Sequence, residues 1–504
     1  MRITHKPATR LPRRLSLLMA PVYQTSATAE LDAGAAKWVP ADARAALASG
    51  DLSGAAGTRL LLHTPSKRGA QRVLLIGLGE KKSLTADRVR RYAGIAAAAA
   101  ARTAGQTAAL LIPTARTRAL PHAELRALVE EGAALGAYKF LTYKSQSGDA
   151  SARPLIRELL LCESSESSTP SERRDGSVRA NALAYGINLC RELGNLPPND
   201  LGPEQLAARA RVEARKAGLK SRVLDERQLA RAGMRALLAV GQGSRRPPRL
   251  IILEHAPRRG DGRPPLVLVG KAVTFDSGGI SIKSAQGMED MKYDMCGGGA
   301  VIGAMAAIGR IAPRRRVIGL VPTAENMPDG GAYRPGDILR SANGLTIEII
   351  NTDAEGRLAL ADALHYAQQY EPSLLVDVAT LTGSIAVALG PSRAGVFSRD
   401  ERLARRVAEL GTRLGEKMWT MPIDDEHLDA VKSDHADLKN SGGRFGGACT
   451  AAAFLSRFAG DVPWVHLDIA SCAWIERDHD LGPRGASGFA VRTLVQLAEE
   501  SLPL

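Results

Sequence analysis

Residues 266–279 read LVLVGKAVTFDSGG. Leu266–Val269 is apolar without alternation, which is typical of a strand covered on both faces by helices. Apolar runs of the same kind recur at 250–253, 317–321, 347–350, 374–379 and 464–469. The sequence therefore predicts an α/β unit with a parallel or mixed sheet. Because the ligand-binding loops of such sheets follow the carboxyl ends of strands, we expect the functional residues there.

The first third of the chain also alternates strand and helix signals. We expect strands at 60–63, 73–78, 108–112 and 155–162, and helices at 85–102 and 121–138. The polar stretch ESSESSTPSERRD, residues 163–175, predicts a linker. Helices are expected after it at 178–193 and 203–217. We predict two domains: a smaller, basic N-terminal α/β domain, residues 1–170, and a larger C-terminal α/β domain, residues 171–504, with a central mixed sheet flanked by helices.

Composition restricts the class of protein. The chain has 504 residues, of which 45% are hydrophobic and 24% charged, and no apolar run approaches the roughly 18 residues of a membrane span. A soluble globular protein with no membrane partner is expected. The net charge is +14, and residues 1–170 hold 24 Lys and Arg against 13 Asp and Glu. This basic excess can attract DNA or another polyanion, but an Arg-rich solvated surface is the simpler interpretation.

Cysteine usage and the N-terminus both favour a cytoplasmic protein. The first 29 residues hold five basic side chains and no acid but no clear cleavage site, so we expect an ordinary N-terminus. The chain contains no G-x-S-x-G, H-E-x-x-H or G-x-x-x-x-G-K-[ST] motif. The cysteines are scattered and form no C-x-x-C pair, which fits a reducing compartment: Cys162, Cys190, Cys296, Cys449 and Cys472.

Two stretches carry polar groups after expected strands. The first runs from Lys271 through Asp276 and a Gly-Gly pair to Lys283, with Asp294 following. The second is IINTDAEGRL, residues 349–358, in which Asp353 and Glu355 share a face if the segment is extended. Arg357 then stands at a helix start, where anions bind. The alternatives are ordinary loop charges in the first stretch and an acidic helix start in the second.

Together the stretches supply four carboxylates: Asp276, Asp294, Asp353 and Glu355. Four like charges in one site repel one another unless cations compensate them, and two divalent ions balance four carboxylates. The sequence therefore suggests a dimetal centre. Beside two such ions, the pKa of Lys271 would fall and its neutral amine could coordinate.

The residues of these stretches resemble those of the leucine aminopeptidase (cytosol aminopeptidase) family, in particular its bacterial aminopeptidase A branch. The similarity covers about residues 180–500 and rests on GKAVTFDSGGISIK (270–283), MKYDMCG (291–297), NTDAEGRL (351–358), DVATLTG (377–383) and WVHLDIA (464–470). The N-terminal domain is similar only around residues 73–79. Family members are two-metal exopeptidases that hydrolyse the N-terminal residue, preferably leucine or another apolar one, from peptides.

The resemblance also implies roles for individual residues. Asp276 and Glu355 would bridge two divalent ions, Mn²⁺ or Zn²⁺, while Lys271 and Asp294 complete one site and Asp353 the other. Lys283 would polarise the scissile carbonyl, and Arg357 would hold a bicarbonate ion that acts as general base. Met291 and Thr380 would line the pocket for the substrate side chain, although both suit a core equally well.

Further expectations come from the family alone. The resemblance implies a homohexamer in the cytoplasm. Some bacterial members bind DNA, so a role in transcription regulation or site-specific recombination is the main alternative or additional function. An inactive scaffold is disfavoured because all seven expected metal and catalytic residues are present.

Overall fold

The computed structural model describes residues 1–12, 14–26, 28–64, 69–114, 120–145, 156–163 and 169–500. Contacts divide the chain into a first unit, Met1–Ala184 with Arg477–Arg484, and a second, Tyr185–Glu476 with Gly485–Leu504. The expected two-domain α/β architecture is confirmed. The exact boundary after residue 170 stays a prediction.

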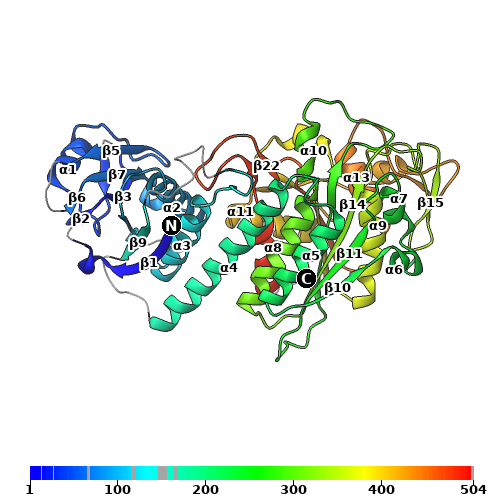
Figure 1. The fold of residues 1–504 in the computed structure, drawn as a ribbon, viewed down its shortest axis with the longest axis horizontal. Coiled ribbons are helices and arrows are strands. Elements are labelled where there is room, and N and C mark those ends of the chain that lie inside the picture. The colour runs from blue at the N-terminus through cyan, green and yellow to red at the C-terminus, as the bar shows by residue number, and fades with distance from the viewer. Residues whose placement is uncertain are drawn as a thin grey trace. The chain divides into compact units, whose positions relative to one another are not determined.

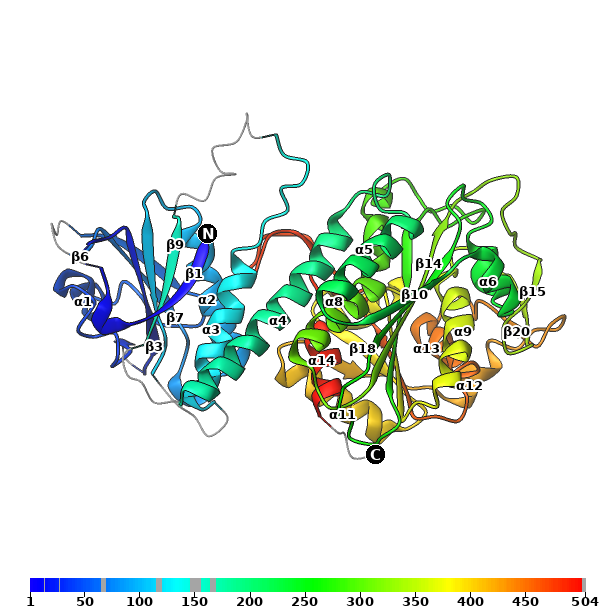
Figure 2. The ribbon, with the colours of Figure 1, turned by 60° about the horizontal axis from the view of Figure 1, so that its bottom comes forward.

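The first unit is a sheet covered on both faces by helices. Its elements are β1 (Arg2–Pro7), β2 (Arg14–Leu15), β3 (Leu17–Gln24), β4 (Ala29–Leu31), α1 (Ala41–Ala48), β5 (Arg59–His63), β6 (Gly69–Ala70), β7 (Arg72–Gly77), α2 (Ala86–Ala100), β8 (Thr107–Leu111), α3 (His122–Gly136) and β9 (Glu158–Glu163). The main sheet has the order β1-β9-β8-β3-β7-β5, with β4 on β3. Helices α2 and α3 pack on one face and α1 on the other (Figures 1 and 2).

The expected strands and helices of this unit are present, within a few residues. Leu155, the first residue of the expected strand 155–162, lies outside the described residues. Strands β1 and β3 were not expected, because β1 is largely polar and β3 contains Pro21, which normally argues against a sheet-interior strand.

The linker expected at 163–175 is only partly correct. Residues 164–168 lie outside the described residues, but residues 170–175 form the start of helix α4, Pro170–Asn195. Thr169 and Glu172 form a capping box, in which the amide of Glu172 donates to Thr169 Oγ1 and the amide of Thr169 donates to Glu172 Oε2. This cap and the proline at the first helical position start the helix earlier than its polar composition suggests.

The second unit is built on a mixed sheet with the order β10-β11-β14-β12-β17-β21-β18-β19, and β13 pairs with β14. Its strands are β10 (Lys220–Leu224), β11 (Arg249–His255), β12 (Leu266–Gly270), β13 (Ala272–Asp276), β14 (Val317–Asn326), β15 (Ile338–Arg340), β16 (Thr346–Glu348), β17 (Leu374–Ala379), β18 (Ala394–Phe397), β19 (Met418–Thr420), β20 (Leu438–Lys439), β21 (Trp464–Asp468), β22 (Trp474–Ile475) and β23 (Gly485–Ala486). Its helices after α4 are α5 (Pro203–Lys216), α6 (Glu226–Arg231), α7 (Arg235–Val240), α8 (Cys296–Ile311), α9 (Gly356–Ala367), α10 (Gly383–Leu389), α11 (Glu401–Arg413), α12 (Asp425–Asp429), α13 (Gly447–Ser456) and α14 (Val491–Glu499).

Helices cover both faces of this sheet. Figures 1 and 2 show α5 and α8 on one side of β14 and α7 and α9 on the other. The strands β14, β12, β17 and β21 are mutually parallel, while β11 and β18 border them in antiparallel pairing. The continuous apolar runs are explained by this burial from both sides. Residues 347–350 are an exception, because β16 belongs to a small separate sheet, β15-β16-β20.

In the part of the chain that the structure describes, none of the helices combines the length and the apolar character that crossing a membrane requires.

Candidate functional site

The carboxyl ends of the parallel strands carry the expected site residues. Lys271 directly follows β12, Asp276 ends β13, and Thr380 follows β17. Asp294 lies in the 3-10 segment η4, Met288–Met295, which runs into α8. Asp353 and Glu355 belong to the loop between β16 and α9, and Glu355 is the N-cap of α9.

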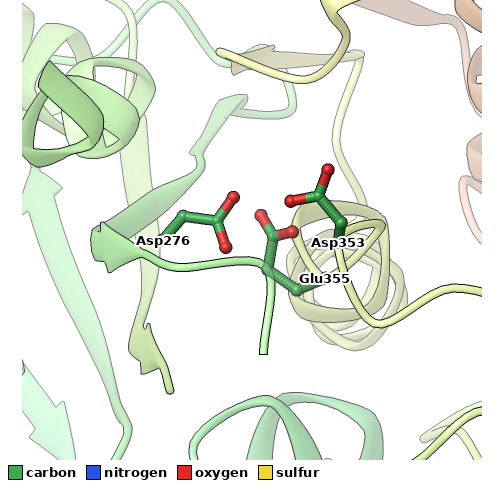
Figure 3. Close-up of side chains that lie close together, drawn as sticks. All are labelled: Asp276, Asp353 and Glu355. Carbon is green, nitrogen blue, oxygen red and sulfur yellow. The ribbon is translucent and has the colours of Figure 1, made fainter. Parts of the chain in front are cut away.

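Three carboxylates converge from two different elements. Asp276, Asp353 and Glu355 each offer an oxygen atom, and these atoms lie within 4.8 Å of one another. Figure 3 shows the Asp276 carboxylate facing those of Asp353 and Glu355, which come from the opposite side beside a helix. Asp276 and Glu355 are almost fully buried, whereas Asp353 is partly exposed. The predicted convergence of these carboxylates is therefore present.

Asp294 joins the cluster through Lys271. The Lys271 Nζ atom lies 2.8 Å from both Asp294 Oδ2 and Glu355 Oε1 and donates to the carbonyl of Thr380 at 2.9 Å. Thr380 Oγ1 donates to Asp294 Oδ1 at 2.7 Å, which orients this carboxylate. Thr380 thus has a positioning contact that the sequence analysis did not foresee.

Lys283 binds the other half of the cluster. Its Nζ atom lies 2.7 Å from Asp276 Oδ2 and also contacts Asp353 Oδ1. Each lysine therefore faces a different pair of carboxylates. Met291 is half-buried in η4, three residues before Asp294.

A glycine pair and a single glycine make this close packing possible. Gly278 and Gly279 have φ values of +87° and +66°, and a Cβ on Gly279 would lie 2.7 Å from Asn326 Oδ1. A Cβ on Gly356 would lie 2.7 Å from Lys271 Nζ. Any larger residue at 356 would push the lysine away from the carboxylates.

Electrostatics explain how these groups tolerate burial. Burial raises the pKa of Asp294 and of Glu355, and neighbouring carboxylates raise them further. For Lys271, burial would lower the pKa, but the charges of Asp294 and Glu355 outweigh it, so the pKa is raised. The same balance, with Asp276 as the main partner, raises the pKa of Lys283. Both lysines therefore carry a positive charge among the carboxylates.

The donor set fits divalent cations. Four carboxylates face only two lysines, which leaves excess negative charge. Asp294 Oδ2 and Glu355 Oε1 are buried oxygens that accept no well-formed hydrogen bond, despite their short distance to Lys271. Hard divalent ions bind carboxylate oxygens, and these two oxygens keep lone pairs that no well-formed hydrogen bond occupies.

Arg357 lies in the first turn of α9 and is buried. Its Nη1 donates to the carbonyl of Asn440 at 2.6 Å, while its Nε is buried without a hydrogen-bond partner. Burial lowers the pKa of Arg357 to about 10, although the nearby charge of Glu355 opposes this. A buried guanidinium with an unused donor is a suitable binding group for a small anion.

Sequence reasoning missed two buried asparagines beside this site. Asn326 ends β14 and donates through Nδ2 to Asp276 Oδ1 at 2.8 Å. The rule that ligand-binding residues follow strand ends would have indicated it. Asn440 follows β20 and contacts the loop that carries Asp353. Its surroundings in the sequence are polar and gave no comparable signal.

Comparison with known proteins agrees with this arrangement. The catalytic-domain model of the cytosol aminopeptidase family matches residues 188–495, and the family's N-terminal domain model matches residues 23–147. A probable cytosol aminopeptidase of Roseiflexus castenholzii is 45% identical over 89% of this chain and 91% of its own. One from Desulfovibrio desulfuricans is 43% identical over 96% of each chain.

Solved structures of similar proteins have a similar fold. The bottromycin maturation enzyme BotP in complex with Mn is 35% identical, has a TM-score of 0.83, and is matched over 96% of this chain and 99% of its own. A point mutant of tomato leucine aminopeptidase is 33% identical, with a TM-score of 0.84 over 99% of this chain and 96% of its own. From these matches and the clustered carboxylates and lysines, the chain belongs to the cytosol aminopeptidase family and is a peptidase.

Proposed function

We propose that this protein is a two-metal aminopeptidase that hydrolyses the N-terminal residue, preferably leucine or another apolar residue, from peptides. The observation that carries the proposal is the convergence of three carboxylates within 4.8 Å, flanked by Lys271 and Lys283. Two divalent ions, when bound, supply an activated water, polarise the scissile carbonyl and capture the free α-amine. Hydrolysis then requires no nucleophilic side chain.

The two lysine–carboxylate groups support an assignment of ligands. We propose that Asp276 and Glu355 would contribute to both ion sites, that Lys271 and Asp294 would complete one site, and that Asp353 would complete the other. Lys271 would have to lose its proton to act as a ligand. The contacts of Lys271 with Asp294 and Glu355 group these residues together, as those of Lys283 group Asp276 with Asp353. Mn²⁺ or Zn²⁺ would suit this oxygen and amine donor set.

The remaining polar groups suit the chemistry of amide hydrolysis. Lys283 carries its charge at the partly exposed side of the cluster, where it can donate to the oxygen of a substrate carbonyl as negative charge develops. The free Nε of Arg357 favours a bound anion, for which we propose bicarbonate in the role of general base. Met291 and Thr380 are proposed to line the pocket for the substrate side chain.

Assays with a matched pair of substrates test this proposal. The protein is treated with a chelator and assayed with Leu-Gly and N-acetyl-Leu-Gly before and after Mn²⁺ or Zn²⁺ is restored. Metal-dependent cleavage of the free dipeptide alone is expected, and it should be lost in Asp353→Asn but retained in Asp337→Asn, a carboxylate paired with Arg334. Cleavage of both substrates, or of neither with any metal, would overturn the proposal.

DNA binding is a second candidate function, supported by the basic excess of residues 1–170, which hold 24 Lys and Arg against 13 Asp and Glu. A duplex should bind with a steep salt dependence, and Asp353→Asn should bind it equally well if the two activities are separate. Binding that does not respond to salt would argue against this role.

The family resemblance further supports a cytoplasmic homohexamer, which we propose as the working assembly. Native mass spectrometry of the full chain tests the oligomeric state. A monomer or dimer as the main species at micromolar concentration would contradict it.

A further inference from the structure

The side chain of Asn440 uses all of its hydrogen-bonding groups on one loop. Its side chain is fully buried. Its Oδ1 accepts from the amides of Ile350, at 2.8 Å, and Asn351, at 3.3 Å. Its Nδ2 donates to the carbonyls of Asn351, at 2.7 Å, and Ala354, at 3.4 Å. An asparagine amide offers two acceptor sites and two donors, and all four are used here.

The main chain of Asn440 adds two further contacts. Its amide donates to the carbonyl of Glu348 at 3.0 Å, at the end of β16. Its carbonyl accepts from Arg357 Nη1 at 2.6 Å. This one residue therefore contacts the chain from the end of β16 to the first turn of α9.

The loop needs such a partner because it has no regular structure of its own. Residues 350–355 lie between β16 and α9, outside any strand or helix. Buried backbone groups without hydrogen bonds are costly, so a loop with few local bonds must find partners elsewhere. Asn440 supplies four of them, and Asp353 and Glu355 are part of the segment it holds.

We infer that Asn440 is a positioning residue that holds Asp353, Glu355 and Arg357 in the arrangement that binds divalent ions. Its side-chain hydrogen bonds go to backbone groups of the loop and not to the carboxylates, so it acts through the loop backbone. The inference rests on the proposed metal-dependent function. Residues that orient metal ligands in this way contribute about 10- to 100-fold to metal affinity.

A nearby residue provides a matched control. Asp437 also connects the chain around β20 to β16, because its Oδ2 accepts from the amide of Thr346 at 2.8 Å and from its hydroxyl at 2.7 Å. Its hydrogen bonds do not reach residues 350–357. Asp437→Ala therefore loosens the same pair of segments without releasing the loop that carries Asp353.

Binding of Mn²⁺ to the chelator-treated full chain tests the inference by calorimetry. Asn440→Ala should bind Mn²⁺ at least about 10-fold more weakly than the wild type, whereas Asp437→Ala should bind within twofold of it. Thermal unfolding of the metal-free variants shows whether both remain folded. Affinity of Asn440→Ala within twofold of Asp437→Ala would overturn the inference.

Hydrogen exchange gives a second test that does not depend on metal or on a stable alanine variant. In the metal-free wild type, the amides of Ile350 and Asn351 should exchange slowly although they lie outside helices and strands, and they should lose protection in Asn440→Ser. Unprotected amides in the wild type would overturn the inference. Failure of the wild type to bind Mn²⁺ would instead count against the proposed function, and the exchange result would still decide the role of Asn440.

Discussion

Lys271 Nζ lies 2.8 Å from Glu355 Oε1, and both side chains are buried. Lys271 follows a central parallel strand, while Glu355 occupies the N-cap position of the helix that packs beside it. The contact therefore fixes the end of the sheet against the start of α9 at the candidate metal site. It also places a positive charge where the carboxylates would otherwise repel one another.

Glu355→Gln should remove metal-dependent stabilisation. The substitution keeps the size of the side chain but removes one charge from the cluster, so divalent ions lose a ligand. In the wild type, Mn²⁺ at about 100 times its Kd should raise the free energy of unfolding by about 2.7 kcal/mol. Thermal unfolding with and without Mn²⁺ measures this metal-dependent increase in stability. An equal metal-induced shift in Glu355→Gln would contradict the assigned role.

Gly356→Ala should lower activity although alanine favours a helix by about 1 kcal/mol over glycine. Its Cβ would lie 2.7 Å from Lys271 Nζ and displace the lysine from Asp294 and Glu355. Gly330→Ala is the matched control, because no atom lies within 4 Å of a Cβ at that position. Steady-state hydrolysis of Leu-Gly should fall at least tenfold for Gly356→Ala alone, about 1.4 kcal/mol in the barrier. Equal activity of both variants would contradict this account of Gly356.

The sequence predicted the cluster of carboxylates and lysines better than the residues around it. Asp276, Asp294, Asp353, Glu355 and the two lysines could be found because they follow apolar strands or share short motifs. Asn440 could not be found from the sequence. Its hydrogen bonds go to backbone groups about 90 residues earlier in the chain, which come close to it only in the folded protein. Residues 347–350 were expected to form a strand of the central sheet, but β16 belongs to a small separate sheet. A short apolar run does not specify which sheet it joins.

Lys283→Met should lower kcat more than it weakens metal binding. The lysine contacts Asp276 and Asp353, but its positive charge opposes cation binding, so Mn²⁺ affinity should be unchanged or higher. Loss of one donor to a developing oxyanion costs about 10²- to 10³-fold in kcat. Lys292→Met serves as control, because Lys292 faces the ring of Trp474 instead. A kcat for Lys283→Met equal to that of the control would exclude a role in catalysis.

Asp362 should make the stability of the protein depend on pH. It is fully buried in α9, and its two oxygens accept from the amides of Leu237, at 2.9 Å, and Ala342, at 2.8 Å. Burial raises the pKa of Asp362 from 3.8 to about 7, although these hydrogen bonds oppose the change. Between these values the folded protein keeps a proton that the unfolded chain releases.

The contribution of Asp362 to the free energy of unfolding is therefore largest below about pH 4 and falls as the pH rises to about 7. At about 1.4 kcal/mol per pKa unit, the loss is at most about 4 kcal/mol. Asp362→Asn removes this titration while keeping the shape of the side chain, although its single amide oxygen can accept from only one of the two backbone N–H groups, and its NH₂ then faces the other. Urea unfolding of both proteins in chelator from pH 4 to 9 measures the difference. The wild type should lose stability relative to the variant up to about pH 7 and no further above it, and a difference that stays constant from pH 4 to 7 would refute the raised pKa.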